Sequence, residues 1–390
     1  MKKYLFLTAL VTVLAFVVLG ACNLPLFGGA PANVEAEISG SISEDTVLEE
    51  GKRYAITDDV TVESTLTIEP GVYLDFAADT YMLVRGTILA SGTAEAPIVM
   101  RGAVQETGYW RGVQINSSDI TNVFEHVMVM HTGSSELADN KTAILIEGFS
   151  QGVLNLKNVT ISDVEGYGLF VEASGTIRDF TSNNFTDIEG TPVAVPVDQV
   201  HTLDANTTFD SSTNTRNAVE ITGGTLELQN EVTWTALNSS VPYYITDNIT
   251  LNSDLVISED AIFEMDSEIL FLARDGGIRA LGSAAEPVIF RGAVEQAGYW
   301  RGIQINSSDT TNLLQNVEVR HAGHPTGFQG TQDAEANILV EGFSQGYLTL
   351  KDSTVADGGG YGVFVENSAT FVEEGTNTFE NLANADVYFD

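Results

Sequence analysis

The chain has 390 residues and a formal net charge of −37, because 54 aspartates and glutamates face 17 lysines and arginines. A surface this acidic repels nucleic acid and anionic lipid headgroups, which excludes nucleic-acid binding as a function. The single cysteine excludes an internal disulfide and a cysteine-based metal site. Two explanations of the acidity stay open: solubility of an extracytoplasmic protein, which we favour, and calcium binding by carboxylate oxygens.

The first 21 residues have the layout of a secretory signal peptide, with Lys2 and Lys3 ahead of an apolar run over residues 4–19. The run ends in Leu-Gly-Ala-Cys, which resembles the bacterial lipobox. We therefore predict a lipoprotein signal peptide over residues 1–21 and attachment to a lipid bilayer through acylated Cys22. The predicted location is the outer membrane or cell surface, on the extracytoplasmic side of a bacterial envelope. The alternative, an uncleaved anchor, needs a longer apolar run.

Residues 22–39 contain Pro25, Gly28, Gly29 and Pro31 without apolar periodicity, which indicates a tether. From residue 40 to residue 390 the sequence consists of short alternating apolar runs, for example residues 60–62, 66–68, 73–76, 82–84 and 98–100. Apolar residues at a helical spacing are not sustained for ten or more positions anywhere in this part. The sequence therefore predicts an all-β protein.

An internal duplication organises this part of the chain. Residues 101–119 read RGAVQETGYWRGVQINSSD and residues 291–309 read RGAVEQAGYWRGIQINSSD, with fifteen of nineteen positions identical. The match continues at EGFSQG, residues 147–152 and 341–346, and at residues 166–172 and 360–366. We predict two related halves, about residues 55–190 and 244–385, joined by further coils over residues 191–242 into one continuous solenoid.

Very short strands and a 21-residue step from Val159 to Phe180 favour a β-helix over a sandwich or barrel. Residues 65–72, 86–94, 96–99 and 108–113 together resemble the bacterial right-handed parallel β-helix repeat proteins of the pectate-lyase-like superfamily. The resemblance implies a right-handed parallel β-helix of about 15 coils with an apolar interior. We expect residues 38–54 to cap its first end.

A repeated Tyr-Trp-Arg motif is the candidate ligand site. An aromatic side chain beside an arginine can stack on a sugar ring and pair with its carboxylate. The alternative, which we favour, is that the tryptophan covers the tube and anchors a loop. Arg101 and Arg291 are interpreted as loop-fixing residues. The candidate residues are Tyr109, Trp110, Arg111, Tyr299, Trp300 and Arg301.

The resemblance also implies possible enzyme chemistry. A pectate-lyase-type elimination needs carboxylates that hold calcium and a base, and polygalacturonase-like hydrolases carry Asn-Thr-Asp, Asp-Asp, Gly-His-Gly and Arg-Ile-Lys clusters. Of those clusters only Asp58-Asp59 is present, which we interpret as a solvated turn. His131 and His321 recur after a strand, which favours a turn role over a metal site.

Repetition favours a binding or architectural surface over two copies of an active site. We therefore predict a non-catalytic, lipid-anchored, monomeric cell-envelope protein that binds a glycan or a surface protein or acts as a structural module. The alternative is a polysaccharide lyase or glycoside hydrolase. No cofactor is predicted, and calcium is the one ion considered. The binding hypothesis predicts exposed aromatic side chains in a row, and the enzyme hypothesis predicts a basic residue among carboxylates.

Overall fold

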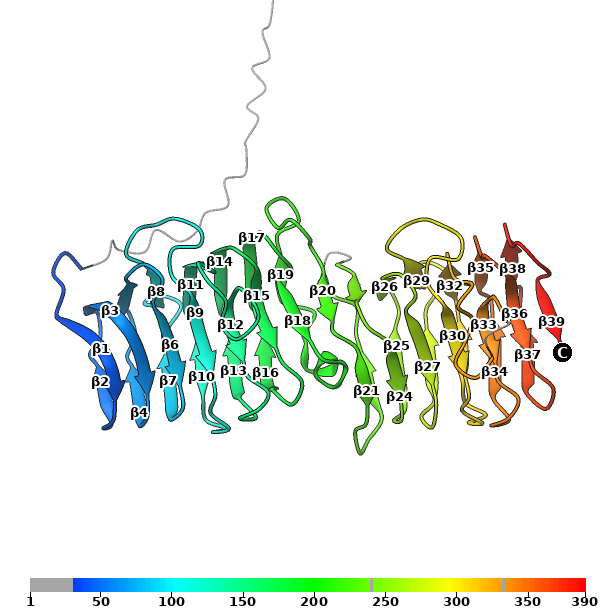
Figure 1. The fold of residues 1–390 in the computed structure, drawn as a ribbon, viewed down its shortest axis with the longest axis horizontal. Coiled ribbons are helices and arrows are strands. Elements are labelled where there is room, and N and C mark those ends of the chain that lie inside the picture. Colours follow the sequence, from blue (N-terminus) through cyan, green and yellow to red (C-terminus); the bar gives the residue numbers. More distant parts are fainter. Residues whose placement is uncertain (1–30, 239–240, 332–333) are drawn as a thin grey trace, which may run out of the picture. The chain divides into compact units, whose positions relative to one another are not determined.

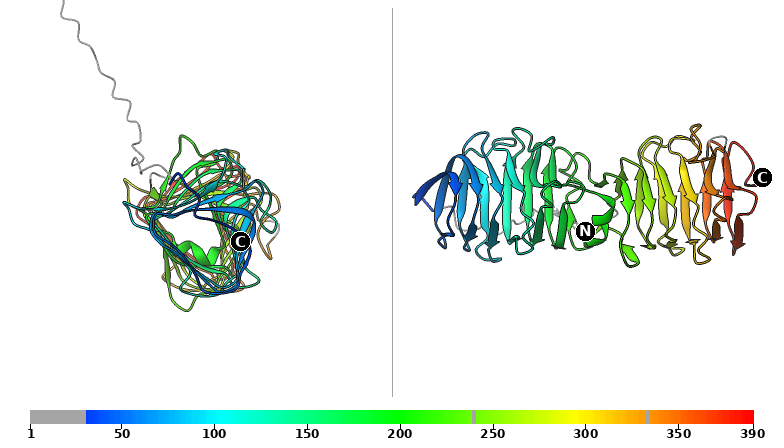
Figure 2. Two further views of the ribbon diagram at one scale, coloured as in Figure 1. Left: turned by 90° about the vertical axis from the view of Figure 1, so that its left-hand side faces the viewer. Right: turned by 60° about the horizontal axis from the view of Figure 1, so that its bottom comes forward.

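The computed structural model describes residues 31–238, 241–331 and 334–390, which form one compact unit from Pro31 to Asp390. Every pairing between its strands is parallel, and each strand pairs with the equivalent strand one coil away (Figure 1). Seen along the axis, the coils superimpose around a common interior (Figure 2). Apolar side chains fill this interior. The prediction of an all-β, right-handed parallel β-helix with an internal duplication is confirmed.

The first half contains three ladders of paired strands. Ladder 1 holds the first parts of β1 (Ala36–Ile42) and β3 (Arg53–Val62), followed by β5 (Tyr73–Phe76), β8 (Ile98–Gly102), β11 (Val127–Thr132), β14 (Thr160–Val164), β17 (Asn184–Ile188) and β19 (Thr208–Phe209). Ladder 3 holds β2 (Thr46–Leu48), β4 (Thr65–Ile68), β7 (Thr87–Ser91), β10 (Val123–Glu125), β13 (Val153–Lys157) and β16 (Thr176–Thr181).

Ladder 2 runs without a break through both halves. Its fourteen strands are the last parts of β1 and β3, then β6 (Tyr81–Val84), β9 (Gly112–Ile115), β12 (Thr142–Ile146), β15 (Tyr167–Val171), β18 (Val193–Val195), β20 (Val219–Ile221), β23 (Tyr243–Ile245), β26 (Ile262–Met265), β29 (Val288–Gly292), β32 (Val317–Arg320), β35 (Thr354–Ala356) and β38 (Thr378–Glu380). Strands β18, β20 and β23 thus connect the two halves through this ladder.

The second half completes its coils with two further ladders. Ladder 4 holds β21 (Gly224–Leu226), β24 (Ile249–Leu251), β27 (Leu270–Ala273), β30 (Gly302–Ile305), β33 (Ala336–Val340), β36 (Tyr361–Val365) and β39 (Val387–Phe389). Ladder 5 holds β22 (Val232–Trp234), β25 (Leu255–Ser258), β28 (Ile278–Leu281), β31 (Leu313–Gln315), β34 (Tyr347–Lys351) and β37 (Thr370–Glu374).

A short 3-10 helix, η1 (Val197–Thr202), takes the place of a strand between ladders 3 and 4. The Gln199 side chain of η1 accepts a hydrogen bond from the Ile177 N–H in β16 at 2.9 Å. On its other side, the Val197 N–H donates to the carbonyl of Gly223 at 3.2 Å, directly before β21. Ladder 4 therefore continues ladder 3, and ladder 5 takes the third side of the coil, which ladder 1 occupies in the first half.

The two halves are out of phase by one strand. By the sequence repeat, β5, β6 and β7 correspond to β26, β27 and β28. From β5 to β25 the chain passes through 21 strands and η1, which at three elements per coil is seven coils and one element. Each repeated feature of the second half therefore lies one ladder further around the axis than its counterpart in the first half.

Apolar side chains fill the tube because alternate residues of each short strand point inward. Aromatic rings stack on one another from coil to coil, as in Tyr243–Phe263 at 5.3 Å and Phe263–Phe290 at 4.9 Å between ring centroids. Strand β1 begins at Ala36, within the segment predicted as a tether. The segment 38–54, predicted as a cap, contributes strands to the first coil, because β1 and β2 pair in parallel with β3 and β4.

Candidate functional site

The two tryptophans of the repeated Tyr-Trp-Arg motif are inside the tube. Trp110 and Trp300 are both 0 % exposed. The Trp110 ring stacks on Phe76 at 3.8 Å between centroids, and its Nε1 donates to the Met130 carbonyl at 2.7 Å. The Trp300 Nε1 donates in the same way to the carbonyl of Arg320. The prediction that these tryptophans offer an outward platform for a ligand is wrong, because a ligand at the surface cannot contact them.

The arginines of the motif are half-buried and hold loops. Arg111 donates to the Glu136 carbonyl at 2.8 Å and lies over the Tyr81 ring at 4.6 Å, while Arg301 donates to the Gly327 carbonyl at 2.5 Å. Burial lowers the pKa of Arg301.

The tyrosines of the motif are half-buried as well. The Tyr299 hydroxyl donates to Asp266 Oδ1 at 3.0 Å, and burial raises its pKa. Ligand binding by Tyr109, Arg111, Tyr299 and Arg301 stays a prediction.

Arg101 and Arg291 form ion pairs between neighbouring coils instead of fixing loops. Arg101 in β8 donates to Asp75 in β5 at 2.8 Å, and Arg291 in β29 donates to Glu264 in β26 at 2.6 Å. Asp75 is only 4 % exposed and is also paired with Arg53. These pairs connect adjacent strands of one sheet and are equivalent in the two halves.

The other polar residues singled out by sequence lie within strands or directly after them. Asp58 and Asp59 are exposed within β3, where Asp59 Oδ1 accepts the Tyr81 N–H at 3.2 Å. His131 and His321 have positive φ angles of 65° and 64° and accept hydrogen bonds through their carbonyls. Burial lowers the pKa of both imidazoles. His131 lies within β11 and His321 directly follows β32, so the two share a backbone conformation, and the shared turn role stays a prediction.

A pocket of about 260 Å³ adjoins His321 in the second half. Three of its charged groups are paired within the protein, because Arg320 donates to Glu318 and to Asp357 at 2.9 Å each. Methionines, Met128 and Met130, stand at the positions of Glu318 and Arg320 in the first half. The paired charges of this pocket are therefore not repeated in the first half.

Two phenylalanines at equivalent turns are the most exposed large apolar side chains in the described part of the chain. Phe149 is 97 % exposed and Phe343 is 96 % exposed. They occupy the third position of the repeated EGFSQG segment, which connects β12 to β13 and β33 to β34. The next most exposed large apolar side chain among the described residues is Phe389, at 65 %.

Hydrogen bonds hold each phenylalanine turn in one conformation. In the first turn, the two carboxylate oxygens of Glu147 accept the N–H groups of Phe149 and Ser150 at 3.0 and 2.7 Å. In the second turn, Glu341 accepts those of Phe343 and Ser344 at 2.9 and 2.8 Å. Because both copies have the same contacts, each phenyl ring is presented on a rigid support.

Close packing against neighbouring coils fixes the same turns. A Cβ atom on Gly148 would lie 2.1 Å from the Ala173 carbonyl oxygen, and one on Gly152 would lie 2.3 Å from that of Ile115. These carbonyls belong to the coils on either side, so the turn is clamped from both directions. The glycines at the equivalent positions of the second turn have the same close approaches, of 2.2 and 2.3 Å.

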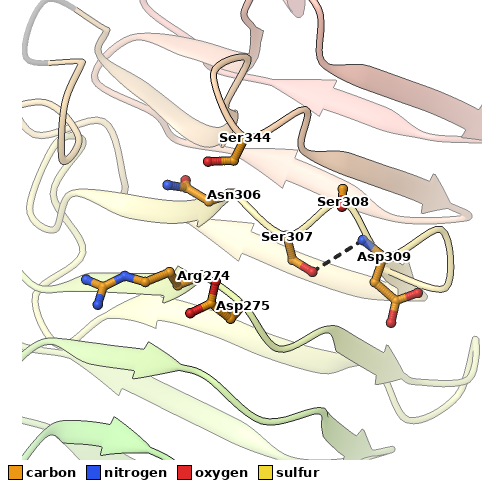
Figure 3. A pocket seen from close by; sticks show the side chains of 7 residues that line it. All are labelled: Arg274, Asp275, Asn306, Ser307, Ser308, Asp309 and Ser344. Carbon is orange, nitrogen blue, oxygen red and sulfur yellow. Dashed lines mark hydrogen bonds between the residues drawn. The ribbon is translucent and has the colours of Figure 1, made fainter.

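A polar pocket of about 350 Å³ adjoins the second phenylalanine turn. Three stacked turns line it, and Figure 3 shows Ser344 on one side of Asn306 with Arg274 and Asp275 on the other. Ser307 accepts a hydrogen bond from the Asp309 N–H at 3.3 Å (Figure 3). The lining residues are Arg274, Asp275, Asn306, Ser307, Ser308, Asp309 and Ser344.

The first half carries the same set of turn residues with two differences. Arg85, residues 116–119 and Ser150 correspond to Arg274, residues 306–309 and Ser344. The Thr87 hydroxyl donates to Asp119 Oδ2 at 2.6 Å, and this bond lowers the pKa of Asp119. The second half has Gly277 in place of Thr87 and an inserted residue, Asp275. The second copy therefore has more space beside the phenylalanine turn and one additional carboxylate there.

A separate polar cluster lies on the outer face of ladder 2 where the halves meet. Half-buried Glu220 in β20 accepts hydrogen bonds from the hydroxyls of Tyr167, Thr191 and Thr246, each at 3.4 Å. Burial raises the pKa of this carboxyl group despite those bonds.

The adjacent coils of the same face carry a second carboxylate. Asp266, which follows β26, accepts the Tyr244 hydroxyl at 2.8 Å, and Arg216 lies over the Tyr244 ring at 3.8 Å. Burial opposes ionisation of Asp266, but hydrogen bonds from Ser267, Tyr244 and Tyr299 outweigh it and lower its pKa. Glu220 and Asp266 thus differ in the direction of their pKa shifts.

Among residues 31–238, 241–331 and 334–390, no group of three or more histidine, cysteine, aspartate or glutamate side chains is arranged to hold a metal ion. The same part of the chain contains no helix that is long and apolar enough to cross a membrane. The signal peptide predicted for residues 1–21 and the acylation of Cys22 lie outside the described residues.

The ladders and the repeated turns define the class of protein: this chain is a parallel β-helix repeat protein. Residues 40–143 match the family model of the pectate-lyase like beta helix domain, which bears out the resemblance in fold. No curated protein sequence and no solved structure matches the chain.

The phenylalanine turns were missed by sequence reasoning, although a signal was present. EGFSQG is repeated, and its phenylalanine stands between glycine and serine in a connection between strands. Connections between strands lie on the surface. A large apolar residue repeated at such a position is the pattern that marks these two residues.

Proposed function

We propose that the protein binds polysaccharide without catalysis, through Phe149 and Phe343 and the polar turn residues beside them. The observation that carries this proposal is the near-complete exposure of both phenyl rings on rigid, equivalent turns. The envelope location and the lipid anchor at Cys22, predicted from the sequence, are part of the same proposal. A protein held at the cell surface would meet extracellular or cell-wall glycans.

The chemistry of the second site suits a sugar better than an ion. Arg274 supplies hydrogen-bond donors, Asp275 and Asp309 supply acceptors, and Asn306 and Ser344 supply groups of both kinds. A sugar ring presents the same mixture of hydroxyl donors and acceptors, and its apolar face can cover a phenyl ring. If a sugar covers about 80 Å² of Phe343, burial contributes about 2 kcal/mol, which is roughly a 30-fold change in Kd.

The test is retention of the purified protein on cellulose, xylan, mannan and peptidoglycan, with and without calcium, while newly formed reducing ends are measured in the same samples. We expect retention on at least one polymer and no reducing ends. The double substitution Phe149→Ala with Phe343→Ala should abolish retention. Phe389→Ala, which removes an exposed phenylalanine elsewhere, is the matched control and should be retained normally. Undiminished retention of the double variant, or no retention of the wild type on any polymer, contradicts the proposal.

Polysaccharide hydrolysis is the second candidate function, and one observation favours it. Glu220 and Asp266 lie two coils apart on one face, about 10 Å along the axis, with pKa values shifted in opposite directions. Inverting glycosidases use an acid and a base at roughly 6.5–9.5 Å, which is somewhat less than this separation. We rank it second because tyrosine and threonine hydroxyls already engage both carboxylates. Reducing ends that disappear with Glu220→Gln would establish this function instead.

A further inference from the structure

We propose that the two phenylalanine turns bind two separate polysaccharide strands, so that one protein molecule cross-links them. This inference rests on the proposed glycan binding and adds the geometry of the ligand to it. The feature that carries it is the one-strand phase difference between the two halves of the β-helix.

The two sites lie at different corners of the coil. The first phenylalanine turn follows β12, so it lies at the corner between ladders 2 and 3. The second turn follows β33, so it lies at the corner between ladders 4 and 5. Because ladder 4 continues ladder 3, the second site is one corner further around the axis than the first.

The two sites are also far apart along the axis. The coil that contains β33 is the seventh after the coil that contains β12. At about 4.8 Å per coil the separation is about 34 Å. A polysaccharide chain that runs straight along the β-helix axis from Phe149 stays at the corner of Phe149, whereas Phe343 lies at a different corner. Both turns are clamped by neighbouring coils, so neither can swing around to meet the other's strand.

Two sites that share an exposed phenylalanine on an equivalent turn but face different sides favour two polysaccharide chains over one. A single strand could contact both phenylalanines only by winding around the β-helix, which requires a curved conformation over this distance. Two polysaccharide chains can each bind at one site without bending. Binding would then join polymers, as multivalent binders do when their sites cannot engage one ligand together.

The experiment uses particles coated with xylan, mannan or peptidoglycan, mixed with the purified protein and followed by light scattering. We expect agglutination on the polymer that retains the protein, with a maximum at intermediate protein concentration and a decline in excess protein. The single variants Phe149→Ala and Phe343→Ala should still be retained on that polymer, each with one site, and should lose agglutination. Phe389→Ala should agglutinate like the wild type.

The outcomes separate the two proposals. Wild-type protein that is not retained contradicts the glycan-binding function itself. Wild-type protein that is retained but does not agglutinate particles overturns the cross-linking inference alone. Agglutination by the single variants also overturns it, because association of protein copies would then supply the second site. Complete loss of retention in each single variant would show one strand that needs both turns, which likewise contradicts cross-linking.

Discussion

Replacement of Trp110 by alanine should destabilise the protein far more than replacement of Phe149, although both are large aromatic residues of the same half. Trp110 is fully buried, stacks on Phe76 and donates its Nε1 hydrogen to the Met130 carbonyl. Truncation of a buried tryptophan costs about 3–5 kcal/mol, and an unpaired buried carbonyl adds about 1 kcal/mol or more. We therefore expect Trp110→Ala to lower the free energy of unfolding by about 4–6 kcal/mol.

Phe149→Ala is the matched comparison, because its ring is 97 % exposed and its turn is held by backbone N–H groups that donate to the Glu147 carboxylate. Its expected effect is within about 0.5 kcal/mol. Urea unfolding followed by far-ultraviolet circular dichroism measures both. With a slope of about 3 kcal/mol/M, Trp110→Ala should lower the midpoint by about 1.3–2 M. A Trp110→Ala protein within about 1 kcal/mol of the wild type would refute the placement of this ring in the core.

Three further predictions concern the charged groups and turns. Burial raises the pKa of Glu220, so the protonated carboxyl group contributes stability below its unfolded-state pKa, and this contribution is lost as the pH rises through the folded-state pKa. The urea midpoint of Glu220→Gln, which carries no such charge, should therefore rise relative to that of the wild type between pH 4 and pH 7. Asp75→Asn should cost about 1–3 kcal/mol in urea unfolding, because it leaves two half-buried arginines unpaired, whereas Glu63→Gln in an exposed pair should cost about 0.5 kcal/mol or less. Gly133→Ala should cost at least about 2 kcal/mol more than Gly330→Ala, because both have positive φ but only the first would place Cβ 1.9 Å from a carbonyl oxygen; equal melting temperatures would contradict this.

The fold could be predicted from the sequence because it follows from local patterns. Short alternating strands, turn residues between them and a long repeat predict stacked coils, and about 15 coils were expected where ladder 2 has fourteen strands. The direction in which an individual side chain points is harder to predict from the sequence. In a strand, a shift of one residue moves a side chain from the surface to the core. The position of Trp110 directly after a turn therefore does not determine whether its side chain points outward or into the core.

The candidate site depends on distances that sequence spacing does not supply. Arg274, Asn306 and Ser344 come from three successive coils, and only the stacking of their turns brings them to one pocket. The exchange of Thr87 for Gly277 and the insertion of Asp275 distinguish the two copies, but their effect on the pocket requires the structure. The repeat contains both phenylalanines, but the sequence alone does not show that their side chains are exposed or which polar residues lie beside them.

The continuity of ladder 2 has a mechanical consequence. Within each half, a force along the axis is shared by three ladders of backbone hydrogen bonds that lie parallel to it. At the junction, among the described residues, β16 and β21 have no direct strand pairing, nor have β19 and β22. In place of a strand ladder, η1 is joined to the neighbouring coils by the hydrogen bonds Ile177–Gln199 and Val197–Gly223. The load there falls mainly on the pairs β18–β20 and β20–β23. Under tension the molecule should yield first at this joint, with each half unfolding afterwards at higher force.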